Sequence, residues 1–138
     1  QGNGDVPMGL ERDVALVKSA EIIVFIYPTW WGGLPAQLKG WLERVMLPGT
    51  AFVFNENNKV RPGLRNIRRI HIASTFGSPW LYVRLVNDNG RRILARAFRL
   101  NTSLRTKVST SSLYAMDTAT DASRKSFLLS LEKKMGTL

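Results

Sequence analysis

The stretch that decides the fold is residues 21–52, EIIVFIYPTWWGGLPAQLKGWLERVMLPGTAF. Residues 22–27 form an unbroken apolar run of β-branched and aromatic types, which predicts a strand buried on both faces, as in a parallel sheet covered by helices. Pro28 ends this strand, and a loop over residues 29–33 follows at its carboxyl end. Open α/β sheets bind ligands at that end. Two adjacent tryptophans there favour a flat partner, although a pair of ordinary core side chains is the alternative.

A helix follows this loop over residues 35–47. Pro35 suits the first turn, because that position tolerates a missing N–H, and Pro48-Gly49 ends the helix. Apolar side chains recur at steps of three and four and are predicted to face the sheet: Leu38, Trp41, Leu42, Val45 and Met46. Strand, loop and helix together make half of a βαβ unit.

The rest of the chain continues this alternation. Before the first strand, a helix capped by Asp13 is predicted to run through Ala20. After the second helix, the predicted elements are a polar loop over residues 55–66, a strand over 67–75, a short helix over 81–86, a helix over 90–100 and a strand over 108–116. A last helix, capped by Thr120 or Asp121, reaches about Met135 and is predicted to turn three side chains inward: Phe127, Leu128 and Leu131. There is no internal repeat or low-complexity linker. The pattern predicts one α/β domain over residues 1–138.

Composition excludes several classes of chemistry. The 138 residues are 44% hydrophobic, which is enough for one domain with a core. The chain has no cysteine, so disulfides and thiolate chemistry are excluded. It has a single histidine, which argues against a transition-metal site. That histidine, His71, lies in a predicted strand, which favours a structural role. No apolar run approaches the ~20 residues that span a bilayer, and no signal segment is recognisable, so a cytoplasmic protein is expected.

The charge is concentrated in the middle of the chain. The formal net charge is +10, and residues 59–107 hold 12 Lys and Arg but a single acid, Asp88. Such a stretch attracts phosphate-bearing cofactors, anionic membranes or nucleic acid. In the helix over 90–100, however, Arg92, Arg96 and Arg99 share an outer face, and solvated arginines are the favoured explanation. No motif that reads nucleic acid is present, so no specific nucleic-acid partner is expected.

Several of these motifs resemble a known family. Tyr27-Pro28-Thr29-Trp30-Trp31, Pro35-Ala36 with Leu38-Lys39-Gly40-Trp41, and Pro48-Gly49 resemble the flavodoxin-like NAD(P)H:quinone oxidoreductases. Ser74-Thr75-Phe76-Gly77, residues 87–92 and residues 113–117 resemble later segments of that family. The resemblance extends from about residue 12 to the C-terminus, and its first segment is the most specific.

The resemblance implies a flavodoxin-like three-layer sandwich whose parallel sheet has five strands. Three core strands are visible in this sequence, and they match the third, fourth and fifth of the family. The first strand, and the loop after it that would hold the flavin phosphate, have no counterpart. We therefore expect the chain to be part of a longer protein. A truncated, inactive relative is the alternative.

The resemblance also implies a site. FMN or FAD would bind against two loops made of Pro28, Thr29, Trp30, Trp31, Gly32, Ser74, Thr75, Phe76 and Gly77. Tyr82 stands where quinone reductases carry a tyrosine that stabilises charge during hydride transfer, although an ordinary surface tyrosine is the alternative. Two positions depart from the family. Phe76 replaces a glycine or tyrosine, and Asp88 stands where the animal enzymes have a histidine that partners the tyrosine.

The function implied by the resemblance is transfer of two electrons from NAD(P)H, through a flavin, to a quinone or similar flat acceptor. In this family the site usually lies at a homodimer interface, so a homodimer is expected. The alternative is a flavodoxin-like regulatory subunit without important turnover, bound to a membrane transporter or another partner. The basic stretch over 59–107 would suit an anionic membrane or an acidic partner of that kind.

Overall fold

The computed structural model describes residue 6 and residues 8–138. In chain order its elements are α1 (Glu11–Ser19), β1 (Ile22–Pro28), α2 (Ala36–Val45), β2 (Phe52–Phe54), β3 (Val60–Pro62), β4 (Arg69–Thr75), α3 (Trp80–Leu85), α4 (Asn89–Arg92), η1 (Ile93–Phe98), η2 (Arg99–Asn101), β5 (Lys107–Leu113), η3 (Met116–Thr118) and α5 (Asp121–Met135). The three predicted core strands are present. The last ends at Leu113 rather than Met116, because the backbone turns at Ala115, where φ is 52°.

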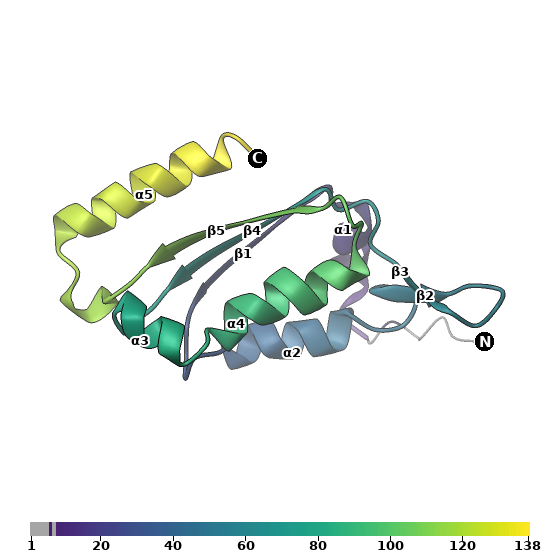
Figure 1. Ribbon diagram of the computed structural model, residues 1–138. Helices are drawn as coiled ribbons and strands as arrows, with labels where there is room; N and C mark the ends of the chain where they lie inside the picture. Colours follow the sequence, from purple (N-terminus) through teal and green to yellow (C-terminus); the bar gives the residue numbers. More distant parts are fainter. Residues whose placement is uncertain (1–5, 7) are drawn as a thin grey trace.

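The main sheet is parallel, with the strand order β1-β4-β5. Helix α2 and the helix that begins with α4 lie along one face of this sheet, and α5 lies on the opposite side (Figure 1). The segments α4, η1 and η2 follow one another without a break, and η1 is a π-helix of 6 residues. This arrangement confirms the expected parallel sheet with helical layers.

The core lies between the sheet and the helices α2 and η1. The ring of Phe25, at the centre of β1, meets Trp41 edge-on at 6.5 Å and Phe98 at 5.1 Å between ring centroids. All five apolar residues that the sequence predicts to face the sheet, four in α2 and Met46 directly after it, pack into or against this core. Burying one such side chain stabilises the fold by about 1.5–3 kcal/mol. Pro35 lies one residue before the helix, in its N-cap position, rather than in the first turn.

Strand β1 is not buried on both faces, contrary to the prediction. Phe25 and Tyr27 are buried, but Ile22, Val24 and Ile26 alternate with them and are exposed, Ile26 to 71%. The reason is position, since β1 is the edge strand of the described sheet and α5 contacts the far edge at β5. The central strand β4 has the doubly buried pattern that the sequence assigns to β1.

Helix α1 begins at Glu11, and Asp13 therefore lies inside its first turn instead of capping it. The Asp13 carboxylate accepts a hydrogen bond of 3.1 Å from Nε1 of Trp41 and so joins α1 to α2. At the other end of α1, the Asn66 side-chain amide donates to the carbonyls of Val17 and Ala20. The carbonyl groups at the C-terminal end of α1 are thus satisfied by Asn66, a residue distant in sequence.

The predicted polar loop over residues 55–66 contains a strand. Residues 52–54 and 60–62 pair as the antiparallel hairpin β2–β3, with Phe52 opposite Pro62. Its turn is closed by the Asn55 carboxamide oxygen, which accepts from the N–H groups of Asn57 and Lys59. In Figure 1 this hairpin lies at the end of the molecule away from α3.

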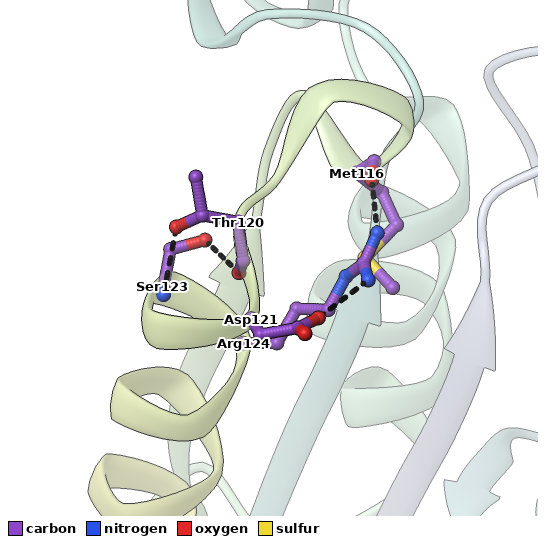
Figure 2. A network of polar contacts seen from close by, with 5 residues as sticks. All are labelled: Met116, Thr120, Asp121, Ser123 and Arg124. Atoms are coloured by element: carbon purple, nitrogen blue, oxygen red, sulfur yellow. Dashed lines mark hydrogen bonds and ion pairs between the residues drawn. The ribbon is translucent and has the colours of Figure 1, made fainter.

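Helix α5 is capped by Thr120, as predicted. Its hydroxyl accepts from the N–H of Ser123 at 3.2 Å, and Arg124 donates to the Asp121 carboxylate and to the Met116 carbonyl (Figure 2). Phe127 is half-buried, but Leu128 is exposed, so the prediction that it turns inward is wrong. None of the described helices is both long and apolar enough to cross a membrane.

Candidate functional site

The loop after β1 is a tight turn. The N–H of Trp30 donates to the Gly33 carbonyl at 3.3 Å, and the N–H of Gly33 donates back to the Trp30 carbonyl at 2.9 Å. The two residues between them, Trp31 and Gly32, have φ of 49° and 69°. Positive φ at both central positions is typical of a type I′ turn. The N–H of Thr29 donates to the Thr75 carbonyl at 2.8 Å and fixes this turn to β4.

Trp31 is an unusual residue for such a turn. Asn and Gly are favoured there because a side chain with a full Cβ costs about 1–2 kcal/mol in the left-handed region. The indole is also fully exposed to solvent. Backbone strain of this kind clusters at ligand-binding sites, and here it holds a large aromatic surface where packing within the described chain does not need it.

The loop after β4 forms the second wall. The N–H of Phe76 donates to the Leu113 carbonyl, and the Phe76 carbonyl accepts from the N–H of Met116. The Phe76 ring stacks on Tyr114 with centroids 5.0 Å apart. A Cβ on Gly77 would lie 2.8 Å from a carboxylate oxygen of Asp117, so this position needs glycine or a displaced carboxylate. The segment after β5 therefore holds the second loop in place.

The third wall is the segment before α4. The N–H of Asn89 donates to the Gly32 carbonyl at 3.1 Å. Gly90 packs so closely on the turn that a Cβ there would lie 2.9 Å from the carbonyl carbon of Gly33. Asp88 is buried and caps α4, and its carboxylate lies 2.6 Å from Nε of Arg91. A short segment distant in sequence thus supports the tryptophan turn from behind.

These walls enclose an open cavity of about 500 Å³ at the carboxyl ends of β1 and β4. Seven of the predicted site residues line it: Thr29, Trp30, Trp31, Gly32, Phe76, Gly77 and Tyr82. Three others do not. Pro28 is the exposed last residue of β1, Ser74 is buried with its hydroxyl 3.4 Å from that of Ser112, and Thr75 ends β4. Their role in binding stays a prediction.

Five further residues line the cavity that were not among the predicted binding or catalytic residues: Ser78, Val83, Val86, Asp88 and Asn89. Of these, the family resemblance places Asp88 where the animal enzymes carry the histidine that partners the tyrosine. Val83 lies in α3 and Val86 is the residue directly after its last one, and their spacing of three places both side chains on the same face. Asp88-Asn89-Gly90 carries the residue types of a turn followed by a helix cap, and this signal could have placed Asp88 near a loop. Nothing in the local pattern indicates that it meets the tryptophan turn.

Three buried oxygen atoms at or near the cavity have no hydrogen-bond partner within the described part of the chain: Tyr27 Oη, Thr29 Oγ1 and Asp88 Oδ2. The Asp88 oxygen has Arg91 close by, but the N–H does not point along the line between them. Burial, and secondarily the Asp88 charge, raises the pKa of Tyr27, so its phenol is protonated. Of the two hydroxyls, that of Thr29 belongs to a residue that lines the cavity, where it is available to hydrogen-bond a molecule that enters.

The family model for the flavodoxin-like fold matches residues 5–99. The chain belongs to the flavodoxin-like fold family. The resemblance in the sequence motifs is thereby confirmed, and so is the fold class. In this flavodoxin-like chain the cavity lies where open α/β sheets bind their ligands, outside the carboxyl ends of the strands.

Relatives of this flavodoxin-like chain include the uncharacterized NAD(P)H oxidoreductase of Haemophilus influenzae, 34% identical over 76 residues, which are 55% of this chain and 37% of that protein. The FMN-dependent NADH:quinone oxidoreductase of Cereibacter sphaeroides is 39% identical over 62 residues, 45% of this chain and 31% of that protein. A solved structure from Streptococcus mutans matches with a TM-score of 0.81 at 22% identity, over 94% of this chain and 66% of that one. The chain spans about a third of the length of these two curated relatives.

Proposed function

We propose that the cavity holds the isoalloxazine ring of FMN and that the protein passes two electrons from NAD(P)H to a quinone or similar flat acceptor. A bound flavin supplies the redox chemistry, because it accepts a hydride and releases two electrons. The observation that carries the proposal is the open cavity of about 500 Å³ with aromatic walls and an unpaired Thr29 hydroxyl. The name of the Cereibacter sphaeroides relative supports the choice of FMN and of a quinone.

The loops offer the hydrogen-bond donors that such a ring needs. Among the described residues, the N–H groups of Trp31, Gly32 and Gly77 donate to no other backbone carbonyl. They lie in the two loops that line the cavity and can donate to the oxygens and nitrogens at the polar edge of a flavin. The Trp30 and Phe76 side chains provide apolar walls that exclude water from the ring.

Tyr82 is the proposed catalytic residue. It lies on α3, lines the cavity and is half exposed, so its hydroxyl can reach a molecule that enters from solvent. In this role it donates a hydrogen bond to an acceptor oxygen on which negative charge develops. The chain's single histidine, His71, lies in the middle of β4 and does not line the cavity, so among the described residues Tyr82 has no histidine beside it there.

The exposed apolar surface beside the cavity supports a homodimer. Trp31, Trp80, Leu81 and Leu85 are all exposed on the turn and on α3. A monomer rarely leaves such a cluster in water, and a second copy would cover it. The dimer would then close the cavity from the solvent side.

A flavin titration tests the proposal. We expect the purified protein to be yellow, or to bind added FMN with quenching of the FMN fluorescence. The isosteric substitution Thr29→Val should weaken FMN binding by about tenfold, because the flavin loses one uncharged hydrogen-bond partner at a buried position. A colourless protein that gains no FMN contradicts it. Oxidation of NADH or NADPH with benzoquinone then separates an enzyme from a flavin-bearing regulatory subunit, which would bind FMN without turnover.

A further inference from the structure

A second, larger cavity lies at the other end of the sheet from the tryptophan turn. It measures about 650 Å³ and is bounded by β3, by the end of the helix formed by η1 and η2, and by the loop before β5. Five arginines line it: Arg61, Arg65, Arg96, Arg99 and Arg105. We call it the arginine cavity. The hairpin that contributes Arg61 is at the end of the molecule opposite α3 in Figure 1.

Within the described part of the chain, no acidic side chain forms an ion pair with an arginine of this cavity. The ion pairs among the described residues involve Lys39, Arg68, Arg91 and Arg124 instead. Guanidinium groups gathered around a hollow repel one another and raise its positive potential. An anion that enters relieves this repulsion, so the cavity is electrostatically complementary to a negatively charged ligand.

Solvated surface arginines are the simplest alternative, but one wall of this cavity is a fixed structure. Arg99 donates through Nε to the Thr106 carbonyl at 3.2 Å and through Nη2 to the Leu104 carbonyl at 3.1 Å. The buried Thr102 hydroxyl donates to the Arg99 carbonyl at 2.7 Å. The N–H of Leu64 donates to the Asn101 carbonyl and joins this loop to the segment after β3. The concave shape is thus held by hydrogen bonds.

The lining also has an apolar part. Pro62, Ala95, Leu100 and Leu104 contribute to the same cavity, and Leu104 is 91% exposed. A simple inorganic anion would leave these side chains in water. A ligand with a flat apolar part would cover them, while its charged part reaches the arginines, whose planar forks match phosphate oxygens two at a time.

We propose that the arginine cavity binds a small phosphate-bearing ligand of the nucleotide class. The phosphates lie against Arg61, Arg65, Arg96 and Arg105, and the base covers the leucines. The volume is within the range of small-molecule sites, about 300–1,000 Å³, and fits one nucleotide. The hollow shape favours this ligand over a membrane, because a flat bilayer surface would contact the rim and leave the interior unfilled.

Calorimetric titration of the purified protein, saturated with FMN, tests the proposal with ADP, pyrophosphate and adenosine as probes. ADP is expected to bind, and adenosine to bind at least about tenfold more weakly because it has no charge for the arginines. Pyrophosphate should bind more weakly than ADP, because it leaves the leucines uncovered. Added salt should weaken ADP binding, since the arginines are exposed.

The double substitution Arg65→Gln with Arg96→Gln should weaken ADP binding by at least about tenfold. Both side chains are exposed and take part in none of the ion pairs among the described residues, and their loss relieves repulsion, so the thermal unfolding temperature should not fall. Arg99 is left in place because it holds the wall. The control is Arg44→Gln, which removes an equally exposed charge on α2 and should leave ADP affinity within twofold of the original.

Three results would overturn the proposal. Equal ADP affinity in the double variant would place the nucleotide elsewhere, for example at the flavin site. Pyrophosphate binding as tightly as ADP would reduce the site to a simple anion site. Sedimentation with phosphatidylserine vesicles, without any ADP binding, would assign the arginines to a membrane surface.

Discussion

Trp31 combines a bulky side chain, a positive φ and full exposure at one position. Replacing it with asparagine keeps the turn but removes the misfit between side chain and backbone. We expect Trp31→Asn to raise the free energy of unfolding by about 1 kcal/mol, because asparagine is among the favoured residues of type I′ turns. Urea denaturation measures this change.

The same substitution should weaken FMN binding several-fold, because the aromatic wall is lost. Trp31→Phe is the matched control, since it keeps both the aromatic face and the backbone strain. It should leave stability nearly unchanged and retain more affinity than Trp31→Asn. A less stable Trp31→Asn protein would show that the indole packs on something the turn needs.

His71 is buried in β4, and its Nδ1 lies 2.8 Å from the hydroxyl of Ser109. Burial, and secondarily the Lys134 charge on α5, lowers the pKa of His71 below its ordinary value of 6.5. The unfolded chain therefore binds a proton more readily than the folded chain between these two pKa values. Stability should be constant above about pH 6.5 and should fall as the pH drops below it.

Urea denaturation at about pH 7.5 and about pH 5.5 measures this loss. His71 is the single histidine of the chain, so the non-titrating variant His71→Gln is a clean comparison. It is expected to be less stable at both pH values but to lose less on acidification. An equal loss in the two proteins would assign the pH dependence to carboxylates.

Sequence reasoning located most of the cavity lining, because a strand end followed by aromatic and glycine residues is a local signal. Ser74 does not line the cavity, because its side chain lies buried toward Ser112, and its role in binding stays a prediction. Strand residues alternate between faces up to the last residue, and the motif does not tell which of them turns into the loop. The resemblance placed Asp88 near Tyr82, but the support that residues 88–90 give to the tryptophan turn was not predicted, because it depends on the tertiary contact between Gly90 and Gly33.

At the scale of elements, the contact between α4 and the tryptophan turn gives a matched pair of glycine variants. Gly90→Ala would place a Cβ 2.9 Å from a backbone carbon of Gly33, so we expect a loss of about 1–3 kcal/mol in unfolding free energy. Gly40→Ala, in the middle of α2, has no neighbour within 4 Å and should gain about 0.5–1 kcal/mol from helix propensity.

Both variants are measured by thermal or urea denaturation, and FMN binding is measured with them. Gly90→Ala should also weaken FMN binding, because the turn must shift, whereas Gly40→Ala should not. If Gly90→Ala proves as stable as the original, α4 can move away from the turn at little cost. The third wall of the cavity is then not rigid.

The prediction of helices and strands succeeded where the spacing of apolar residues and the length of the segment indicate the same type of element. Strand β4 and helix α2 are of this kind, and their inner faces are as expected. The hairpin β2–β3 was missed because its strands are only 3 residues long and enclose the polar residues of a turn. The burial of β1 was overestimated because burial depends on what lies beside a strand, which local sequence does not encode.

For the whole molecule, the proposed dimer makes a direct prediction. Leu85 on α3 is 75% exposed and does not line the cavity. We expect Leu85→Glu to convert a dimer into a monomer, because two carboxylates would face each other across an apolar contact. Size-exclusion chromatography with light scattering measures the mass.

Leu129→Glu is the control for this experiment. Leu129 is similarly exposed but lies on α5, away from the cavity. Its substitution should leave the mass of the assembly unchanged. If the unsubstituted protein is already monomeric, the proposed dimer is wrong, and so is the proposal that a second copy closes the cavity.

The π-helical segment η1 has a consequence for how this chain tolerates insertions and deletions. It separates α4, which supports the tryptophan turn through Gly90, from η2, which carries Arg99 in the wall of the arginine cavity. An i→i+5 turn holds about one residue more than an ordinary helical turn, so deleting one residue within 93–98 would restore ordinary winding while α4 and η2 keep their relative orientation. A deletion within α4 has no such compensation and would rotate the following residues by about 100°. The π-helical segment is therefore a place where this helix can lose a residue while both ends of the molecule keep their positions.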